Sequence, residues 1–581
     1  MNRAALKLPA RNSNAWPLIG LGIVLLATFA SLFWRSVNWD EYWFLSQVNE
    51  LAQHRLTRPL QTIHTRLFLW LAGLPGSDID ALIAGRMGMY LCLLAIAAAI
   101  AGIARHFAGL SAGLFAALAY LSAGYVFQHG YSFRVDPLAA ALLMGSLWAM
   151  LCARLDWRWI AGIGLALGLA GMVTIKVVLY APAFAGIAWL RWSRAGLARA
   201  ELLRLAAIGA AALISFALLY LLHSRGLAHA HEGEASTVLR TSAGFMFKFL
   251  SSDYWPMLRK AATTAPVLTL LIVAFPFALR HVPGSRDEKI ALVGLYAPLS
   301  TLLFYHNTAA YYYTYMLAPV AAACGVLVPF VIRRFGAATT ALVLALNPLV
   351  VWLAEPPSAL PAQRQLADAA QQLFPRGTPY FDHLAMFPSL AKQNMFMTDW
   401  GIDLYRNNEL PRLRETMARV AVPLVVEDHP MFTQALRGEM ERGMASAASP
   451  LAPTTATFKA ATSTPFEDGP VAKPARDLAQ RIGLALGTVR GGYGGPTSRY
   501  VATALDRFAP ELPPSRWSEV VLAAAVLSAS GKGPLSGTEP RVTVALRLLR
   551  ERCRSRENQA FYELSMAART HPVLRRELGE V

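Results

Sequence analysis

The sequence predicts a mostly α-helical membrane protein: a polytopic bundle of about 11 transmembrane helices, with a C-terminal external α/β domain. Of its 581 residues, 55% are apolar and only 15% are charged, against about 25% charged in typical soluble domains. Apolar runs of the length that a lipid-spanning helix needs, about 20 residues, follow one another between residues 16 and 353. These observations exclude a disordered or purely soluble protein.

The predicted spans are separated by short polar or basic segments. The first is predicted to be a retained anchor, because no small-residue cleavage site follows Phe33 and Trp34. The long stretch 157–192 is divided into two helices around Lys176. The spans are 16–34, 81–104, 107–125, 135–153, 157–174, 177–192, 203–222, 264–280, 288–305, 311–332 and 337–353.

The formal charge of +18, which in isolation is typical of nucleic-acid binding, is better explained by membrane topology. Placing the N-terminus inside puts most loop Lys and Arg residues on the cytoplasmic side, as the positive-inside rule requires. We therefore predict a multi-pass protein of the inner (plasma) membrane, without a nucleic-acid partner, whose C-terminal part is external. The sequence has four cysteines, of which Cys92, Cys152 and Cys324 fall inside apolar runs with neither disulfide nor metal-ligand spacing; the fourth is Cys553.

The predicted domains are a transmembrane catalytic domain at 1–353 and a small external α/β domain at 354–444. In the latter, β-like pieces at 378–381, 395–398 and 422–426 alternate with polar helical pieces at 361–373 and 408–420. An Ala/Thr/Pro-rich linker at 445–475 and a basic, partly helical tail at 476–581 follow, and no motif indicates what the tail does.

Two adjacent acids, Asp40 and Glu41, lie among aromatic residues just outside the first span. Aromatic residues favour the membrane interface and would hold these acids near the headgroups. The alternative is an ordinary aromatic belt with incidental acids.

Two further charged positions fall at the same external face. Arg134 and Asp136 open the fourth span, where an ion pair or a favourable helix N-terminus is the plain alternative. Lys176 interrupts an apolar stretch and is either a lysine that reaches the headgroups or a ligand of a phosphate.

Two external loops contain further polar residues. The loop 223–263 contains His223, His229, His231, Glu232 and Glu234. The segment His229 to Glu232 lacks the spacing of a zinc site, and a solvated loop is predicted. His306 precedes the tyrosine-rich segment 311–315, in which Tyr311 and Tyr315 either line a sugar or headgroup pocket or form an aromatic belt.

Taken in order, these motifs resemble the GT-C fold glycosyltransferases that use polyprenyl-phosphate sugars, the relatives of protein O-mannosyltransferases and aminoarabinose transferases. An acidic pair after the first span corresponds to Asp40 and Glu41, and an Arg-x-Asp at the fourth span to Arg134 and Asp136. A Gly-rich segment leading to a Lys corresponds to 164–176, and a Tyr-rich piece before a Pro to 311–319.

The resemblance implies transfer of a hexosyl- or pentosyl-type sugar from a polyprenyl-phosphate donor to a lipid, glycan or protein acceptor, with inversion at the external face. Asp40 is the expected base, with Glu41 and Asp136 as further catalytic residues that position the sugars. No cofactor is assigned with certainty, a divalent cation is possible, and no metal-ligating residue is predicted. Expected partners, besides membrane lipids, are the donor and acceptor, held by Arg134, Lys176, His306, Tyr311 and Tyr315.

Two other classes of function fit parts of the sequence. A polytopic transporter of a lipid-linked or anionic substrate also has many spans with buried charge. However, the acids cluster at one face and no internal repeat is visible, whereas transporters usually carry sites near the midplane, often between repeats. A sensor or assembly protein with a working external domain is the third alternative.

Overall fold

The computed structural model describes residues 14–228, 249, 255–306, 308–373, 376–382, 385–394, 405, 407, 424–427 and 500–503. The chain forms two compact units. The first comprises Met1–Trp34, His54–Leu71 and Ile83–Glu355, and the second comprises Arg35–Gln53, Ala72–Leu82 and Pro356–Val581. Each unit is described by itself.

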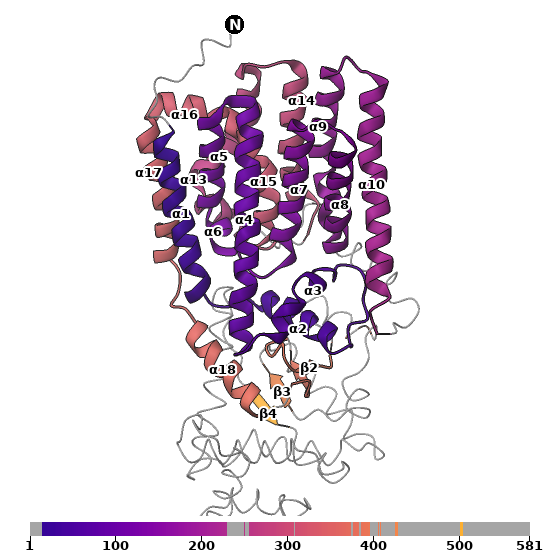
Figure 1. Cartoon of the computed structure of the whole chain (residues 1–581). Coiled ribbons are helices and arrows are strands. Elements are labelled where there is room, and N and C mark those ends of the chain that lie inside the picture. Colours follow the sequence, from indigo (N-terminus) through magenta and orange to yellow (C-terminus); the bar gives the residue numbers. More distant parts are fainter. Residues whose placement is uncertain are drawn as a thin grey trace, which may run out of the picture. The chain divides into compact units, whose positions relative to one another are not determined.

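Helices dominate the described part of the chain (Figure 1). The α-helices are α1 (Ala15–Trp34), α2 (Trp39–Ala52), α3 (His64–Leu67), α4 (Asp78–Ala108), α5 (Leu110–Ser122), α6 (Gly124–His129), α7 (Val135–Cys152), α8 (Trp157–Val173), α9 (Ala181–Arg194), α10 (Arg199–Ser224), α12 (Trp255–Thr263), α13 (Pro266–Ala278), α14 (Arg286–Tyr296), α15 (Tyr312–Cys324), α16 (Val328–Phe335), α17 (Ala337–Leu353) and α18 (Leu360–Leu373). Short 3-10 helices are η2 (Leu69–Gly73), η3 (Ile175–Tyr180), η5 (Leu279–His281), η6 (Ala297–Leu303) and η7 (Gly325–Leu327).

Among the described residues, five helices are long and apolar enough to cross a membrane. They are α1, α4, α7, α10 and the continuous stretch Tyr312–Phe335. A pair bent by 103°, Trp255–Thr263 with Pro266–His281, would make a sixth. A helix occupies each of the 11 ranges named above, but the number of spans stays a prediction.

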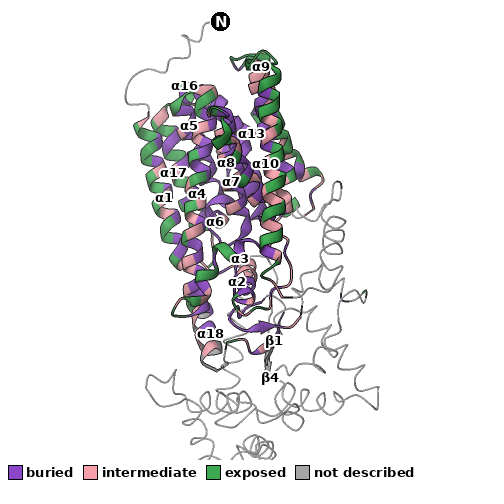
Figure 2. Ribbon diagram, turned by 45° about the vertical axis from the view of Figure 1, so that its right-hand side comes forward, coloured by how far each residue is buried: buried purple, intermediate pink, exposed green. Residues whose placement is uncertain are grey.

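The centre of the first unit is α15. In the stretch Tyr312–Phe335, 89% of the most apolar window is buried, whereas in α10 the corresponding share is 6%. Helix α15 contacts α5, α7, α13 and α14, and Figure 2 shows buried residues inside the bundle and exposed ones on its outer helices. Residues on α15 are therefore held from several sides, while the exposed apolar face of α10 suits lipid.

Glycines allow two pairs of helices in the first unit to approach closely. A Cβ atom at Gly168 of α8 would lie 2.7 Å from the backbone nitrogen of Phe216 in α10, and one at Gly164 would lie 2.4 Å from Ala211 Cβ. Gly186 of α9 and Gly294 of α14 face each other in the same way. The Gly-rich segment that precedes Lys176 is thus explained by helix packing.

A buried histidine joins the segment 54–71 to the end of α10. His223 is fully buried, with Nδ1 2.7 Å from Arg66 Nε and Nε2 2.9 Å from Thr62 Oγ1. The prediction of a solvated loop is therefore wrong for His223, because neighbours distant in sequence enclose it. The rest of that histidine cluster, His229, His231 and Glu232, lies outside the described residues.

The second unit contains a four-stranded sheet with the order β2-β1-β3-β4. Strand β1 (Pro379–Asp382) is parallel to β2 (Ala391–Lys392) and β3 (Leu424–Glu427), and β3 is antiparallel to β4 (Tyr500–Thr503). Strands β1 and β3 lie where β-like pieces are predicted. Strand β4 lies in the basic tail, and the predicted pieces 395–398 and 408–420 lie outside the described residues.

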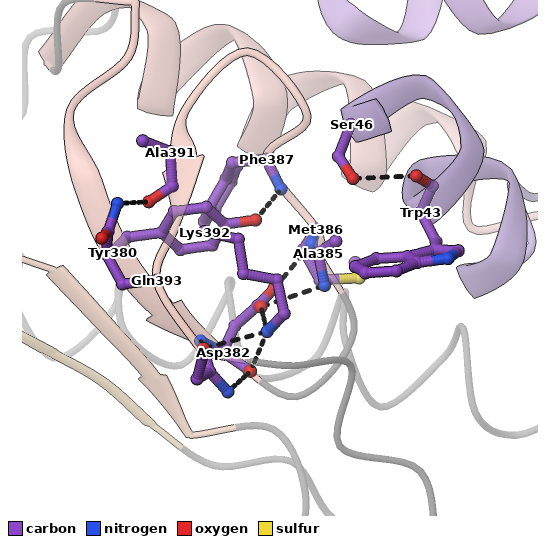
Figure 3. Close-up of polar contacts among 11 residues, drawn as sticks. Trp43, Ser46, Tyr380, Asp382, Ala385, Met386, Phe387, Ala391, Lys392 and Gln393 are labelled. Atoms are coloured by element: carbon purple, nitrogen blue, oxygen red, sulfur yellow. Dashed lines mark hydrogen bonds and ion pairs between the residues drawn. The ribbon is translucent and has the colours of Figure 1, made fainter. Parts of the chain in front are cut away.

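A buried ion pair stands at the end of β1 (Figure 3). Lys392 Nζ lies 2.5 Å from Asp382 Oδ1 and donates to Asn394 Oδ1 at 3.0 Å. The Asp382 carboxylate also accepts the backbone amides of Ala385 and Met386, at 3.0 and 2.6 Å. Because every donor and acceptor in this group has a partner, it is a structural joint between β1, β2 and the turn that links them.

Candidate functional site

An acidic side chain at the start of α7 anchors the candidate site in the first unit. Asp136 lies in the first turn of α7, where a negative charge suits the helix dipole, and it is 1% exposed. Its Oδ1 atom is 2.6 Å from Lys176 Nζ, and its Oδ2 atom is 3.4 Å from both Nε and Nη2 of Arg134. Both carboxylate oxygens therefore face cations.

Lys176 occupies an interruption between two helices. Helix α8 ends at Val173, and Thr174, in an extended conformation, caps η3 with its side chain. The Lys176 side chain is 11% exposed. Among the described residues, its ammonium group has one hydrogen-bond acceptor, Asp136 Oδ1. Since an ammonium group carries three donor hydrogens, two have no acceptor in the part of the chain that the structure describes and could be used by a ligand.

Tyrosine rings cover the cations. The guanidinium of Arg134 lies over the ring of Tyr311, with its Cζ atom 3.3 Å from the ring centre. Lys176 Nζ lies 5.5 Å from the ring centre of Tyr311 and 5.9 Å from that of Tyr312. Aromatic faces attract cations, and most strongly where water is excluded. The rings therefore help to keep two positive charges in a buried place.

Two hydrogen bonds connect α15 to η3. The hydroxyl of Tyr315 donates to the backbone carbonyl of Lys176 at 2.7 Å, and the hydroxyl of Tyr180 donates to the carbonyl of Tyr315 at 2.6 Å. Both side chains are fully buried, and their rings lie 4.8 Å apart. The lysine segment is thus attached to the most buried helix of the unit.

The cluster suits an anionic ligand. One carboxylate, Asp136, meets two cations, Arg134 and Lys176, so these three side chains together carry a formal charge of +1. Burial makes charge–charge interactions stronger than they are in water. Charge-assisted hydrogen bonds from Lys to a phosphate or carboxylate are among the stronger ones in proteins. The geometry can therefore bind an anion through Lys176.

The other two predicted acids belong to the second unit, at the start of α2. Asn38 caps this helix: its side chain accepts from the Asp40 backbone amide at 3.0 Å, and Glu41 Oε2 accepts from the Asn38 amide at 2.8 Å. Glu41 is fully buried and Asp40 is half-buried. A capping box thus accounts for an acid at position 41, a function that was not predicted from the sequence.

Five of the eight predicted site residues come together in the first unit: Arg134, Asp136, Lys176, Tyr311 and Tyr315. His306 is half-buried in the segment between η6 and α15, and its carbonyl accepts from the Thr308 amide at 2.9 Å.

Sequence reasoning missed Tyr180. A usable signal existed, because Pro319 stands four residues after Tyr315 and leaves the Tyr315 carbonyl without its helical donor.

Within the described part of the chain, no group of three or more His, Cys, Asp or Glu side chains has the arrangement of a metal site. The divalent cation left open above therefore gains no candidate ligand set there.

Neither a protein-family model nor a curated protein matches the chain. Solved structures match in part. ArnT from Cupriavidus metallidurans bound to undecaprenyl phosphate is 16% identical, with a TM-score of 0.43 over 63% of this chain and 71% of that chain. The Archaeoglobus fulgidus oligosaccharyltransferase in the apo form is 13% identical, with a TM-score of 0.46 over 76% and 72%. AglB from Archaeoglobus fulgidus, in complex with an inhibitory peptide and a dolichol-phosphate, is 12% identical, with a TM-score of 0.42 over 77% and 73%.

These matches are with glycosyltransferases of the GT-C kind that the sequence motifs resemble. All three TM-scores lie below 0.5, so the function of this chain is inferred below from its own side chains.

Proposed function

We propose that this chain is a membrane glycosyltransferase that moves a sugar from a polyprenyl-phosphate donor to a lipid, glycan or protein acceptor. The observation that carries the proposal is the largely buried ammonium of Lys176, which has one acceptor among the described residues, the Asp136 carboxylate. A buried cation with open donor positions is costly for the fold unless a ligand uses it. A lipid-linked phosphate supplies both the anion and a tail suited to the membrane.

The donor phosphate binds Lys176, with Arg134 adding positive charge from the other side of Asp136. Asp136 orients both cations, since each of its oxygens faces one of them. Because both of its oxygens face cations, Asp136 is a poorer candidate for the base than Asp40.

In the proposed reaction, an acceptor hydroxyl oxygen attacks the anomeric carbon of the donor sugar. A new C–O bond forms as the bond between the anomeric carbon and the phosphate oxygen breaks, which inverts the anomeric centre. The hydroxyl proton passes to a general base, a role for which the sequence motifs propose Asp40. The electron pair of the broken bond stays on the lipid phosphate, where Lys176 and Arg134 stabilise the developing charge.

The proposed location is the inner (plasma) membrane, with the reaction at its external face. This side follows from the distribution of Lys and Arg in the predicted loops. Glu41, His306 and Tyr311 are proposed to contact or position the donor or acceptor. For Glu41 this would be additional to its capping hydrogen bond with Asn38.

The decisive experiment is transfer by the purified full chain in liposomes, with a polyprenyl-phosphate sugar titrated at saturating acceptor. Lys176→Ala removes a charged hydrogen bond, worth roughly 1.5–3 kcal/mol. We expect its apparent affinity for the donor to fall by roughly 10- to 150-fold, with little change in the acceptor dependence. The matched control is Lys260→Ala, because Lys260 is exposed on α12.

Two outcomes contradict the proposal. An unchanged donor dependence in Lys176→Ala removes Lys176 from the site. Failure of the parental protein to form any covalent product with a panel of lipid-phosphate sugars and acceptors, combined with uptake of the lipid into sealed vesicles, favours the transporter. The helix interruption at Lys176 is the feature of this chain that also fits a transporter, because transporters often place their binding sites on broken helices.

A further inference from the structure

We infer that Tyr180 and Tyr315 form a reciprocal clasp that positions Lys176, and that Tyr315 acts through Lys176 rather than by binding substrate itself. The importance of the clasp for activity rests on the proposed function, whereas the effect of the clasp on Lys176 does not. Sequence reasoning places Tyr315 among the substrate-binding residues. The hydrogen bonds of its hydroxyl and carbonyl groups indicate a different role.

The first half of the clasp originates in a proline. Pro319 lies inside α15, and a proline has no amide hydrogen to donate to the carbonyl four residues earlier. That carbonyl belongs to Tyr315. In the buried centre of the bundle, a carbonyl without a donor is unfavourable, and the Tyr180 hydroxyl fills the vacancy at 2.6 Å.

The second half holds the backbone of the lysine. Lys176 lies in η3, a 3-10 segment of six residues between α8 and α9. Such short segments have less favourable hydrogen-bond geometry than an α-helix. The Tyr315 hydroxyl donates to the Lys176 carbonyl at 2.7 Å and so fixes the backbone from which the lysine side chain extends.

The two bonds run in opposite directions between the same two segments. Tyr180 is the last residue of η3 and Lys176 the second, so α15 holds this short helix near both ends. Any shift of η3 along α15 would break both bonds together. From that fixed backbone, Lys176 Nζ reaches Asp136 Oδ1 at 2.6 Å. The clasp therefore sets where the ammonium stands.

The test uses the chemical reactivity of Lys176, which needs no knowledge of the reaction. The full chain in detergent is treated with a small amine-acylating reagent, and labelling rates are followed by peptide mass spectrometry. In the parental protein, Lys176 should react far more slowly than the exposed Lys260. In Tyr315→Phe and in Tyr180→Phe, we expect Lys176 to react about 2- to 10-fold faster, the range that the loss of one hydrogen bond gives.

Tyr312→Phe is the matched control. Its hydroxyl donates to Thr301 Oγ1 at 2.7 Å from the same helix, and it is equally buried. This variant should lose a similar amount of thermal stability while leaving the Lys176 rate unchanged. Asp136→Asn gives the upper limit of the Lys176 labelling rate, because it removes the negative partner of Lys176.

Unchanged Lys176 labelling in both Tyr315→Phe and Tyr180→Phe overturns the clasp, whatever the enzyme activity. An increase in Tyr312→Phe as large as in the other two also overturns it, since any lost hydrogen bond would then suffice. In the transfer assay, Tyr315→Phe should raise the donor KM and leave kcat within a factor of about two. If labelling responds and the parental chain shows no transfer, the clasp stands and the proposed function fails.

Discussion

Lys176 and Asp136 are 40 residues apart in the sequence, yet their charged atoms, Nζ and Oδ1, lie 2.6 Å apart. The pair joins the helix interruption of η3 to the first turn of α7. Its burial means that neither charge is solvated well enough to remain without the other.

Asp136→Asn should lower the stability of the chain strongly. Removing one member of a buried ion pair leaves an uncompensated charge, which typically costs about 3–5 kcal/mol. The double variant Asp136→Asn/Lys176→Met should be more stable than the single one, because it also removes the stranded ammonium. Thermal unfolding in detergent measures both. A double variant less stable than Asp136→Asn alone would mean that Lys176 stabilises the fold through contacts other than this pair.

Replacing the two acids of α2 should affect different properties of the protein, transfer activity for Asp40 and stability for Glu41. Asp40→Asn is expected to lower transfer by about 10²- to 10⁴-fold, as the loss of a general base does, with little change in stability. Glu41→Ala should cost about 0.5–2 kcal/mol of stability through loss of the capping box. Near-parental transfer by a well-folded Asp40→Asn protein would contradict the assignment of the base.

Glu41→Gln is the control for the capping role. Glutamine can still accept the hydrogen bond from the Asn38 amide, so stability should stay close to that of the parental protein. A large loss of transfer in this variant, without a loss of stability, would support the predicted contact of Glu41 with a sugar. Parental transfer would contradict that contact and leave the capping box as the role that the structure supports.

Two glycines on α8 offer a matched test of helix packing. Gly168→Ala places a methyl group 2.7 Å from the Phe216 backbone nitrogen and 2.8 Å from the Ala212 carbonyl oxygen. Backbone atoms of this kind cannot move aside easily, so we expect a loss of about 1–3 kcal/mol. Gly162→Ala meets nothing within 4 Å and should be neutral or stabilising by up to about 1 kcal/mol. Equal unfolding midpoints for the two variants would show that α8 and α10 separate at little cost.

In the ion pair of the second unit, replacing Asp382 and replacing Lys392 should cost different amounts of stability. Lys392→Met leaves the Asp382 carboxylate with two backbone amide donors, whereas Asp382→Ala removes the carboxylate that lies 2.5 Å from the buried Lys392 ammonium. We therefore expect Asp382→Ala to be the more destabilising variant, by about 3–5 kcal/mol relative to the parental chain. Hydrogen exchange of the β1 and β2 amides measures the difference. The reverse order would mean that the lysine stem, rather than the charge pair, stabilises this joint.

The sequence was informative where physical signals are local. Apolar runs predicted the positions of the helices in the first unit, and the charges of Arg134, Asp136 and Lys176 stood out because the membrane makes such residues rare. Two strands of the second unit were predicted from their apolar pieces. The number of spans and the domain boundaries remain predictions.

What could not be predicted depends on contacts between distant segments. The enclosure of His223 by Thr62 and Arg66 joins residues more than 150 positions apart, and no local pattern announces such a contact. The hydrogen bond of Tyr180 also joins distant segments, although Pro319 indicated that a carbonyl in α15 would lack its helical donor. Strand β4 was missed because four residues in a basic tail give too short a pattern.

The donor positions of the Lys176 ammonium that no described residue fills make the chain suitable for ligand screening before its substrate is known. A compound that binds only the folded protein raises its apparent stability by an amount set by concentration and affinity, about 2.7 kcal/mol at 100 times Kd. Alkyl phosphonates of increasing chain length, compared with neutral analogues of the same tails, should therefore raise the melting temperature of the parental chain and much less that of Lys176→Ala. The tail length at which the gain levels off would measure how much hydrocarbon the protein accommodates, and such compounds would be starting points for inhibitors.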